Sequence, residues 1–429
     1  MNSAARQQVG FATTLSLVIG SIIGVGIFVV PASLAPLGWN APFGWVVSSS
    51  GALCLAFALA TLTRGGEGIQ SHIQHELGPT AGFIAAWSFW CCCWASIAIV
   101  ALAAATALSR INPQLADPAM ATPLAISFVV ILTFVNAMGI RSAGRMQVLT
   151  TLIKVIPLVA VILLFALRSG RGEPAQPLAQ LPLSFDGVAM ASALTLFALT
   201  GFENATTPVG KVSNCRRNIP LAMMIGTLLV AMLYLLSSTS VLFLLPSATV
   251  SVSTAPFADA LAIEWGEGAV VVAAACIAVS AFGGLNANVL ASGELAYAMA
   301  VRNDLPRFFG RTRADGTPVV AQCIAGAFGV GLILLAANRG GESIFTFIIL
   351  VTTVGNLMMY LPGAIAAFRA DRRPVARLII CIAGVFIFFS FYGAGLEANL
   401  WGLLMVVCGL ALRAARRFAA AGRTVAATA

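Results

Sequence analysis

Long apolar segments recur along almost the whole chain, and only short polar stretches separate them. Of the 429 residues, 59% are hydrophobic and only 9% are charged, whereas soluble domains carry about 25% charged residues. So few charges do not cover the surface of a water-soluble fold of this size, and most of the surface must therefore face lipid. The segments are continuously apolar rather than alternating, which excludes a β-barrel. The sequence predicts an all-α membrane protein with about twelve transmembrane helices, at residues 11–36, 42–63, 83–109, 121–139, 145–167, 187–210, 219–246, 267–298, 318–337, 342–368, 375–393 and 396–412.

The basic residues follow this map of spans. If the N-terminus is cytoplasmic, 19 of the 24 lysine and arginine residues lie in cytoplasmic segments, and Arg110, Arg168, Arg171 and Arg339 lie outside. Such a bias sets the orientation of membrane proteins. It predicts a multi-pass protein of the inner (plasma) membrane with both termini in the cytoplasm. It also explains the formal net charge of +9 without nucleic acid as a partner.

Glycines interrupt the first and the sixth predicted span. Gly20, Gly24 and Gly26 fall within seven residues of the first span, and Gly201 follows Thr200 in the sixth. Each glycine weakens a helix by about 1 kcal/mol relative to alanine, and in lipid a broken turn leaves backbone groups unsatisfied unless it lines a cavity. Broken helices at corresponding positions of two halves are typical of secondary transporters. The alternative is that the glycines allow close helix packing.

These breaks suggest how a zwitterion would bind. The free N–H groups that follow the first break, at Val25 to Ile27, attract a carboxylate. The carbonyl end of the first half of the sixth span, at Phe197 to Thr200, attracts an ammonium. The predicted organisation is one transporter domain over 1–429, with a first repeat at about 11–167, a second repeat at about 187–368 and two extra helices at about 375–412.

Three ionisable residues lie within predicted spans: Lys154, Glu203 and Glu294. A charge in the middle of a bilayer costs roughly 2.5–3.5 kcal/mol on insertion scales, which argues for a role. Lys154 is a candidate proton carrier, or a fixed cation that satisfies carbonyls at the first break. Glu203 is a second candidate proton carrier, or a structural carboxyl that binds loop N–H groups. Glu294 is interpreted as structural or gating.

Other chemistry finds little support. Cys91, Cys92 and Cys93 are adjacent on a predicted helix and point about 100° apart, so they are interpreted as small core residues and not as a metal site. His72 and His75 share the polar stretch between the second and third spans, with only Glu76 nearby as a third ligand. No catalytic constellation, polar pore or nucleotide-binding motif is recognisable. The sequence therefore predicts neither an enzyme nor a channel, and no cofactor or metal.

Several motifs together resemble the amino acid–polyamine–organocation superfamily. They are the run from Gly20 to Phe28, the stretch 139–157, Arg216 to Pro220, and Tyr297 to Pro306. The resemblance covers essentially the whole chain and implies the five-plus-five inverted repeat with broken first and sixth helices. Lys154 is similar to the fifth-span lysine that replaces a sodium ion in some members, which implies sodium independence.

Within the superfamily, the chain resembles the bacterial arginine/agmatine antiporter group. Glu203 matches its proton-sensitive carboxylate, and Phe197 matches its substrate-stacking tryptophan. Four positions depart from the group: Phe89 replaces a tyrosine, Leu285 a tryptophan, and Ser21 and Ile97 asparagines. These changes remove polar and stacking partners for a guanidinium.

The resulting prediction is a sodium-independent secondary amino-acid transporter that works by proton coupling or exchange. Because Phe89 and Leu285 suggest an apolar side-chain pocket, neutral substrates are favoured; the alternative is a basic amino acid or polyamine exchanger. Its partners are an amino acid or amine, protons and the lipid bilayer, and a homodimer is possible. The predicted substrate-binding residues are Ser21, Ile22, Gly24, Val25, Gly26, Phe89, Phe197, Ala198, Thr200 and Leu285, with Lys154 and Glu203 for proton coupling.

Overall fold

A computed structural model describes residues 10–63, 69–109, 111–138, 143–203, 212–313, 316–337 and 341–428. In this part of the chain the regular structure is helical, and ten segments are long and apolar enough to cross a membrane. The predicted all-α membrane fold is confirmed. Residues 139–142, at the start of the motif 139–157, and residues 204–211, at the end of the sixth predicted span, lie outside the described residues.

The helices follow the predicted spans closely. Their bounds are α1 (Phe11–Ile22), α2 (Gly26–Leu34), α3 (Asn40–Leu62), α4 (Ile69–Leu77), α5 (Pro79–Ser109), α6 (Pro118–Ala137), α7 (Ala143–Gly170), α8 (Phe185–Leu199), α9 (Cys215–Leu244), α10 (Ser247–Ser251), α11 (Pro256–Val301), α12 (Val319–Ala337), α13 (Gly341–Ala370) and α14 (Pro374–Thr428). Both long helices contain a glycine with positive φ: Gly266 at 66° in α11 and Gly395 at 80° in α14. Because α14 covers the last two predicted spans, the number of separate crossings stays a prediction.

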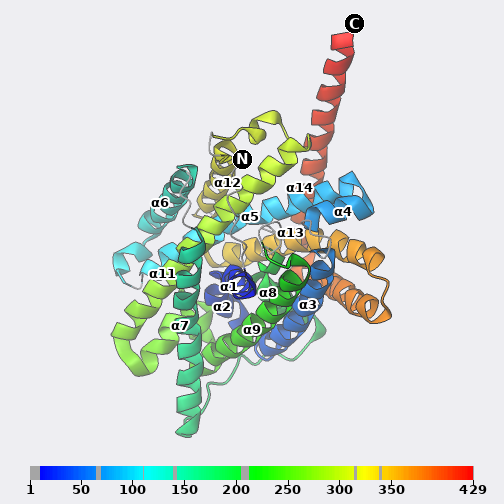
Figure 1. Cartoon of the computed structure of the whole chain (residues 1–429). Coiled ribbons are helices and arrows are strands. Elements are labelled where there is room, and N and C mark those ends of the chain that lie inside the picture. The colour runs from blue at the N-terminus through cyan, green and yellow to red at the C-terminus, as the bar shows by residue number, and fades with distance from the viewer. Residues whose placement is uncertain are drawn as a thin grey trace.

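The short helices α1, α2 and α8 lie in the middle of the bundle (Figure 1). Around them, α1 packs on α7 and α9, α8 packs on α3 and α14, and α2 also contacts α8. On the other side, α5 packs against both α11 and α13. The two interrupted helices are therefore enclosed by long, continuous ones, which shield their broken turns from lipid.

The polar stretch between the second and third spans forms the amphipathic helix α4, with Ile69 and Ile73 buried. Nine residues are too short to span a bilayer, and α4 instead packs on α5 and α13. His75 contacts Glu76 at 3.7 Å. Among the residues that the structure describes, no cluster of His, Cys, Asp and Glu has the composition of a metal site.

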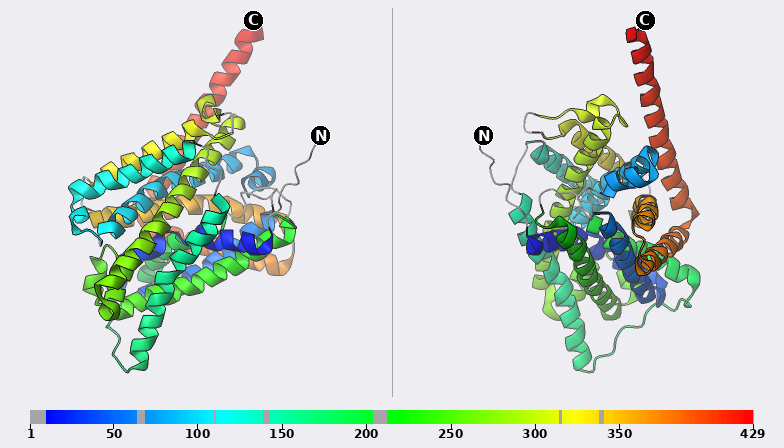
Figure 2. Two further views of the ribbon diagram at one scale, coloured as in Figure 1. Left: turned by 60° about the vertical axis from the view of Figure 1, so that its left-hand side comes forward. Right: turned by 45° about the vertical axis from the view of Figure 1, so that its right-hand side comes forward.

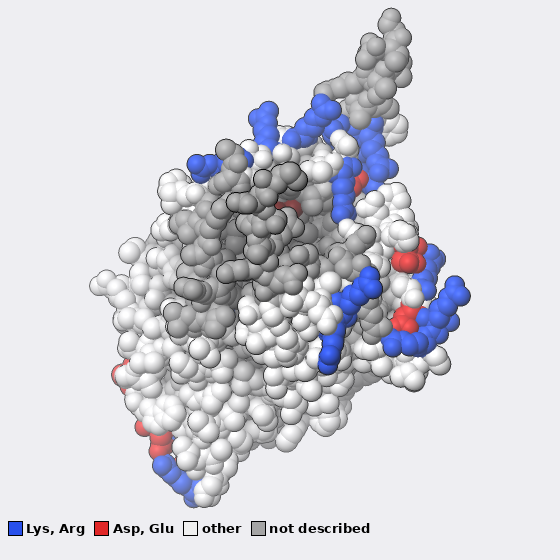
Figure 3. Space-filling model, in the orientation of Figure 1, with Lys and Arg blue, Asp and Glu red and all other residues white. Residues whose placement is uncertain are grey.

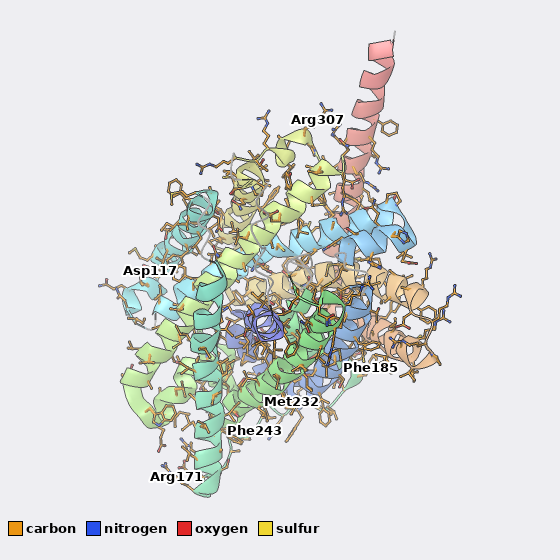
Figure 4. All side chains as sticks on the ribbon, viewed as in Figure 1. Asp117, Arg171, Phe185, Met232, Phe243 and Arg307 are labelled. Carbon is orange, nitrogen blue, oxygen red and sulfur yellow. The ribbon has the colours of Figure 1, made fainter. Side chains whose placement is uncertain are left out.

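Charged residues collect at the ends of the bundle and leave a broad uncharged surface between them (Figure 3). Arg307 and Arg171 mark two opposite ends (Figure 4). Near the Arg307 end, the buried Arg413 of α14 donates to Asp304 at 2.6 Å and to the Pro79 carbonyl at 2.8 Å. The ion pair ties α14 to the segment that follows α11, and the bond to Pro79 ties it to the start of α5. Beyond this point the C-terminal end of α14 projects from the bundle (Figure 2).

Candidate functional site

The first helix break separates α1 from α2. The Gly24 N–H turns back to the Ile22 carbonyl at 2.7 Å, and Ile23 leaves the helical region with ψ of 82°. The first N–H groups of α2 have no acceptor within their own helix. A Cβ on Gly26 would lie 3.0 Å from the Phe197 ring, so this position brings the backbone of α2 close to α8.

The second break ends α8 and touches the first. Thr200 is extended, and Gly201 has a φ of +118°, which favours glycine. A Cβ on Gly201 would lie 2.5 Å from the Ser21 carbonyl oxygen. The Ser21 hydroxyl donates to the Gly201 carbonyl at 2.8 Å. The glycines of the two spans, predicted to mark interruptions, therefore form one contact between two broken backbones.

One cavity lies at this contact and collects residues from α1, α2, α5, α7, α8, α11 and α13. Eleven of the twelve predicted site residues line it: Ser21, Ile22, Gly24, Val25, Gly26, Phe89, Lys154, Phe197, Ala198, Thr200 and Glu203. The first and the last of them, Ser21 and Glu203, lie more than 180 residues apart in the sequence, so the fold brings them together.

Leu285 is the predicted site residue that the structure places elsewhere. Its side chain is fully buried in the hydrophobic core and does not line the cavity. Successive side chains on a helix point about 100° apart. The α11 wall is instead made by Gly283, Gly284, Ala287, Asn288 and Ala291. Glu294, further along α11, is exposed and also lies outside the cavity lining.

The Lys154 ammonium is fully buried and donates to the Gly20 carbonyl at 3.3 Å. It shares this end of α1 with Tyr234, whose hydroxyl donates to the Ile22 carbonyl at 3.0 Å. The last carbonyls of α1 have no donor within their own helix. Lys154 and Tyr234 therefore satisfy, from α7 and α9, groups that the break exposes.

The Glu203 carboxylate lies at the second break and is 4% exposed. One of its oxygens, Oε2, accepts from the Gly201 N–H at 3.0 Å and from the Tyr360 hydroxyl of α13 at 3.1 Å. The carboxylate therefore connects the break to α13. It lines the cavity at the same time.

Sequence patterns missed several residues of the lining. Cys92 and Cys93, interpreted as core residues, are buried but also line the cavity, as do Ser96, Asn288 and Asn356. Trp87 and Trp90 lie on either side of Phe89 in the sequence of α5, but they do not line the cavity and pack in a separate cluster with Phe309. A polar residue within an apolar span was the available signal for Asn288 and Asn356, because an amide in lipid needs a partner.

A helical membrane bundle with a polar cavity between two broken helices is the architecture of a secondary transporter. Comparison with known proteins agrees, because residues 9–402 match the amino acid permease family. The chain belongs to this family, within the amino acid–polyamine–organocation superfamily, and is a multi-pass membrane transporter rather than an enzyme.

Relatives of known function are similar over nearly their whole length. The cadaverine/lysine antiporter of Escherichia coli K12 is 27% identical over 410 residues, which cover 91% of each chain. The putrescine transporter PotE of the same strain is 23% identical over 425 residues, covering 96% of this chain and 97% of PotE. PotE of Haemophilus influenzae is 22% identical over 427 residues, with the same coverage.

Proposed function

We propose that this protein exchanges basic amino acids and diamines across the plasma membrane. The observation that carries the proposal is the Glu203 carboxylate in a cavity between two broken helices. A buried carboxylate is a suitable partner for an ammonium group. Relatives named for cadaverine, lysine and putrescine transport support the same substrate class.

The backbone at the two breaks would hold the common end of an amino acid. The N–H groups at Val25 and Gly26 bind the carboxylate, next to Ser21, Ile22 and Gly24. The Phe197 carbonyl already accepts two hydrogen bonds from Thr200, one from its N–H at 3.4 Å and one from its hydroxyl at 2.7 Å. The amine therefore binds the carbonyls of Ala198 and Thr200, while the Phe197 ring closes the site.

A preference for neutral substrates has lost one of its two supports. It depended on Phe89 and Leu285 as walls of an apolar side-chain pocket. Leu285 points into the core, and the cavity walls carry the amides of Asn288 and Asn356 beside apolar groups such as Phe89. The alternative, a basic amino acid or polyamine exchanger, fits this lining and the relatives better.

Lys154 and Glu203 are the proposed proton-coupling residues. Both are buried, both line the cavity, and each contacts one of the breaks. A cation fixed at the Gly20 carbonyl occupies the place where a coupling ion would bind backbone oxygens, which supports sodium independence. The proposed orientation puts both termini in the cytoplasm, and the proposed repeats remain about 11–167 and 187–368.

The test is uptake of labelled lysine and cadaverine into proteoliposomes that contain the purified protein. Vesicles loaded with unlabelled lysine or cadaverine are compared with empty vesicles, with and without a pH gradient and with and without sodium. We expect uptake that requires an internal amine and is unaffected by sodium. Uptake of neutral amino acids alone would contradict the substrate class, and sodium-driven uptake would contradict the role of Lys154.

Glu203→Gln is the matched variant for proton coupling, because it keeps the shape of the side chain and an oxygen acceptor. We expect its uptake to lose its response to the pH gradient. An unchanged response would leave Lys154 as the remaining candidate, and Lys154→Ala tests it in the same assay.

A further inference from the structure

Asn356 lies on α13, which packs on α8, and it forms part of the cavity wall. Its side chain is 3% exposed, and it lines the cavity together with groups of α1, α8 and α11. An amide in this position carries two donors and an acceptor. In an interior without water it needs partners for them.

The other buried polar groups of α13 have such partners. The Thr352 hydroxyl donates to the Ile348 carbonyl at 2.7 Å, and that of Thr353 donates to the Ile349 and Ala193 carbonyls at 2.9 and 3.2 Å. Tyr360 donates to Glu203. In the part of the chain that the structure describes, the Asn356 amide makes no hydrogen bond. A buried amide that faces a cavity and has no protein partner is suited to a ligand.

Asn288 supplies a second amide to the same cavity from α11. Its Nδ2 donates to the Gly284 carbonyl at 3.0 Å, which fixes the amide and leaves Oδ1 as an acceptor. The other α11 residues of the lining are glycines and alanines. Asn288 is therefore the polar side chain that α11 contributes.

We propose that Asn356, together with Asn288, binds the terminal ammonium of the substrate's side chain and so determines its specificity. This inference rests on the proposed function. Residues four apart on a helix have Cβ atoms about 5–6 Å apart, so Asn356 lies next to Tyr360 and, through it, near Glu203. The carboxylate supplies the charge, and the amide oxygens supply directed acceptors. Lys154, whose charge repels an ammonium, is held at the Gly20 carbonyl of α1.

The experiment compares lysine with norleucine, which is lysine with a methyl group in place of the terminal aminomethyl group. Each compound competes with labelled lysine for uptake into lysine-loaded proteoliposomes, and its stabilisation of the purified protein against heat is a second readout. In Asn356→Leu we expect the preference for lysine over norleucine to fall about 10- to 100-fold, since the hydrogen bond between the amide and the charged ammonium is lost. In Asn356→Asp we expect it to stay or rise, because an acceptor remains and charge is added.

Thr353→Val is the control, because Thr353 is buried on the same helix and lies outside the cavity lining. We expect it to leave the preference for lysine unchanged. Asn288→Leu is expected to act in the same direction as Asn356→Leu with a smaller effect.

The outcomes separate the two proposals. If the wild-type protein takes up no amine, the proposed function is wrong and this inference is wrong with it. If it takes up lysine but Asn356→Leu weakens lysine and norleucine by the same factor, only the inference is overturned. If Asn356→Leu does not fold, Asn356→Asp decides the matter, since a fall in its preference for lysine contradicts an ammonium site.

Discussion

The two helix breaks touch each other beside one cavity, but the protein stabilises them in opposite ways. At the first break, side-chain donors bind exposed carbonyls: Lys154 binds that of Gly20, and Tyr234 binds that of Ile22. At the second break, a side-chain acceptor binds an exposed N–H, because Glu203 accepts from Gly201. Neighbouring side chains thus satisfy carbonyl groups at the first break and an N–H group at the second.

This difference determines which backbone groups remain for a ligand. With the α1 carbonyls bound by Lys154 and Tyr234, the N–H groups at the start of α2 are left to bind a carboxylate. With the Gly201 N–H bound by Glu203, the carbonyls at the end of α8 are left to bind an amine. In the proposed function, the opposite character of the supporting side chains makes the two breaks complementary to an amino acid. Replacing those side chains tests the comparison.

Gly201→Ala should have the largest effect, because it acts on both breaks at once. The new Cβ would meet the Ser21 carbonyl at 2.5 Å, and the φ of +118° is strained for any residue with a side chain. We expect lysine uptake to fall more than about 30-fold, since overpacking and strain each cost about 1–3 kcal/mol. Uptake and the melting temperature of the purified protein are measured together.

Gly268→Ala is the matched control for this change. Gly268 is exposed on α11, and a Cβ there would meet nothing within 4 Å. It should leave uptake unchanged. If Gly201→Ala transports as well as Gly268→Ala, the two breaks do not form the close contact described.

Lys154→Met is expected to have the next largest effect. It keeps the length of the side chain but removes the ammonium from the Gly20 carbonyl. An unsatisfied buried acceptor costs about 1–3 kcal/mol, which corresponds to a loss of about 5- to 150-fold. Initial rates of lysine exchange measure it. Normal exchange in this variant would show that the first break needs no donor from α7.

Tyr234→Phe removes the second donor of the first break and should act less strongly. A neutral hydrogen bond contributes about 0.5–1.5 kcal/mol, so we expect about a 2- to 12-fold loss in apparent affinity for lysine. Because the α2 N–H groups are proposed to bind the substrate carboxylate, lysine should be weakened more than cadaverine, which has no carboxylate. Equal weakening of both would contradict that assignment. The measurement is competition by each compound against labelled substrate.

The sequence predicted these breaks more fully than the walls around them. Glycines and ionisable residues in apolar spans are locally unfavourable, so Gly201, Lys154 and Glu203 are recognisable without a structure. Leu285 was placed in the cavity by its match to a tryptophan, but the rotation of α11 turns it into the core. Asn356 is recognisable as a polar residue in an apolar span, but which groups Asn356 and Tyr360 contact depends on how α13 packs against α5 and α8.

Tyr360→Phe should have the smallest effect and sharpens the comparison at the second break. The Tyr360 ring stacks on Phe202 at 5.6 Å between centroids, and phenylalanine keeps this contact. Glu203 also keeps its bond to the Gly201 N–H. A hydrogen bond to a charged group typically contributes about 1.5–3 kcal/mol, but the carboxylate keeps its Gly201 partner, so we expect a smaller cost of about 0.5–1 kcal/mol, or about a 2- to 5-fold loss in exchange rate. Tyr392→Phe, at an exposed tyrosine that bonds Asp186, is the control and should not change exchange.

A double-mutant cycle decides whether the Tyr360 hydroxyl acts through Glu203. If it does, Tyr360→Phe should cost less in a Glu203→Gln background, because a neutral amide is a weaker acceptor than a carboxylate. The exchange rates of the two single variants and the double variant give the coupling directly. Additive effects would mean that the hydroxyl contributes to exchange independently of the carboxylate. The second break would then depend on Glu203 alone, in contrast to the first break with its two donors.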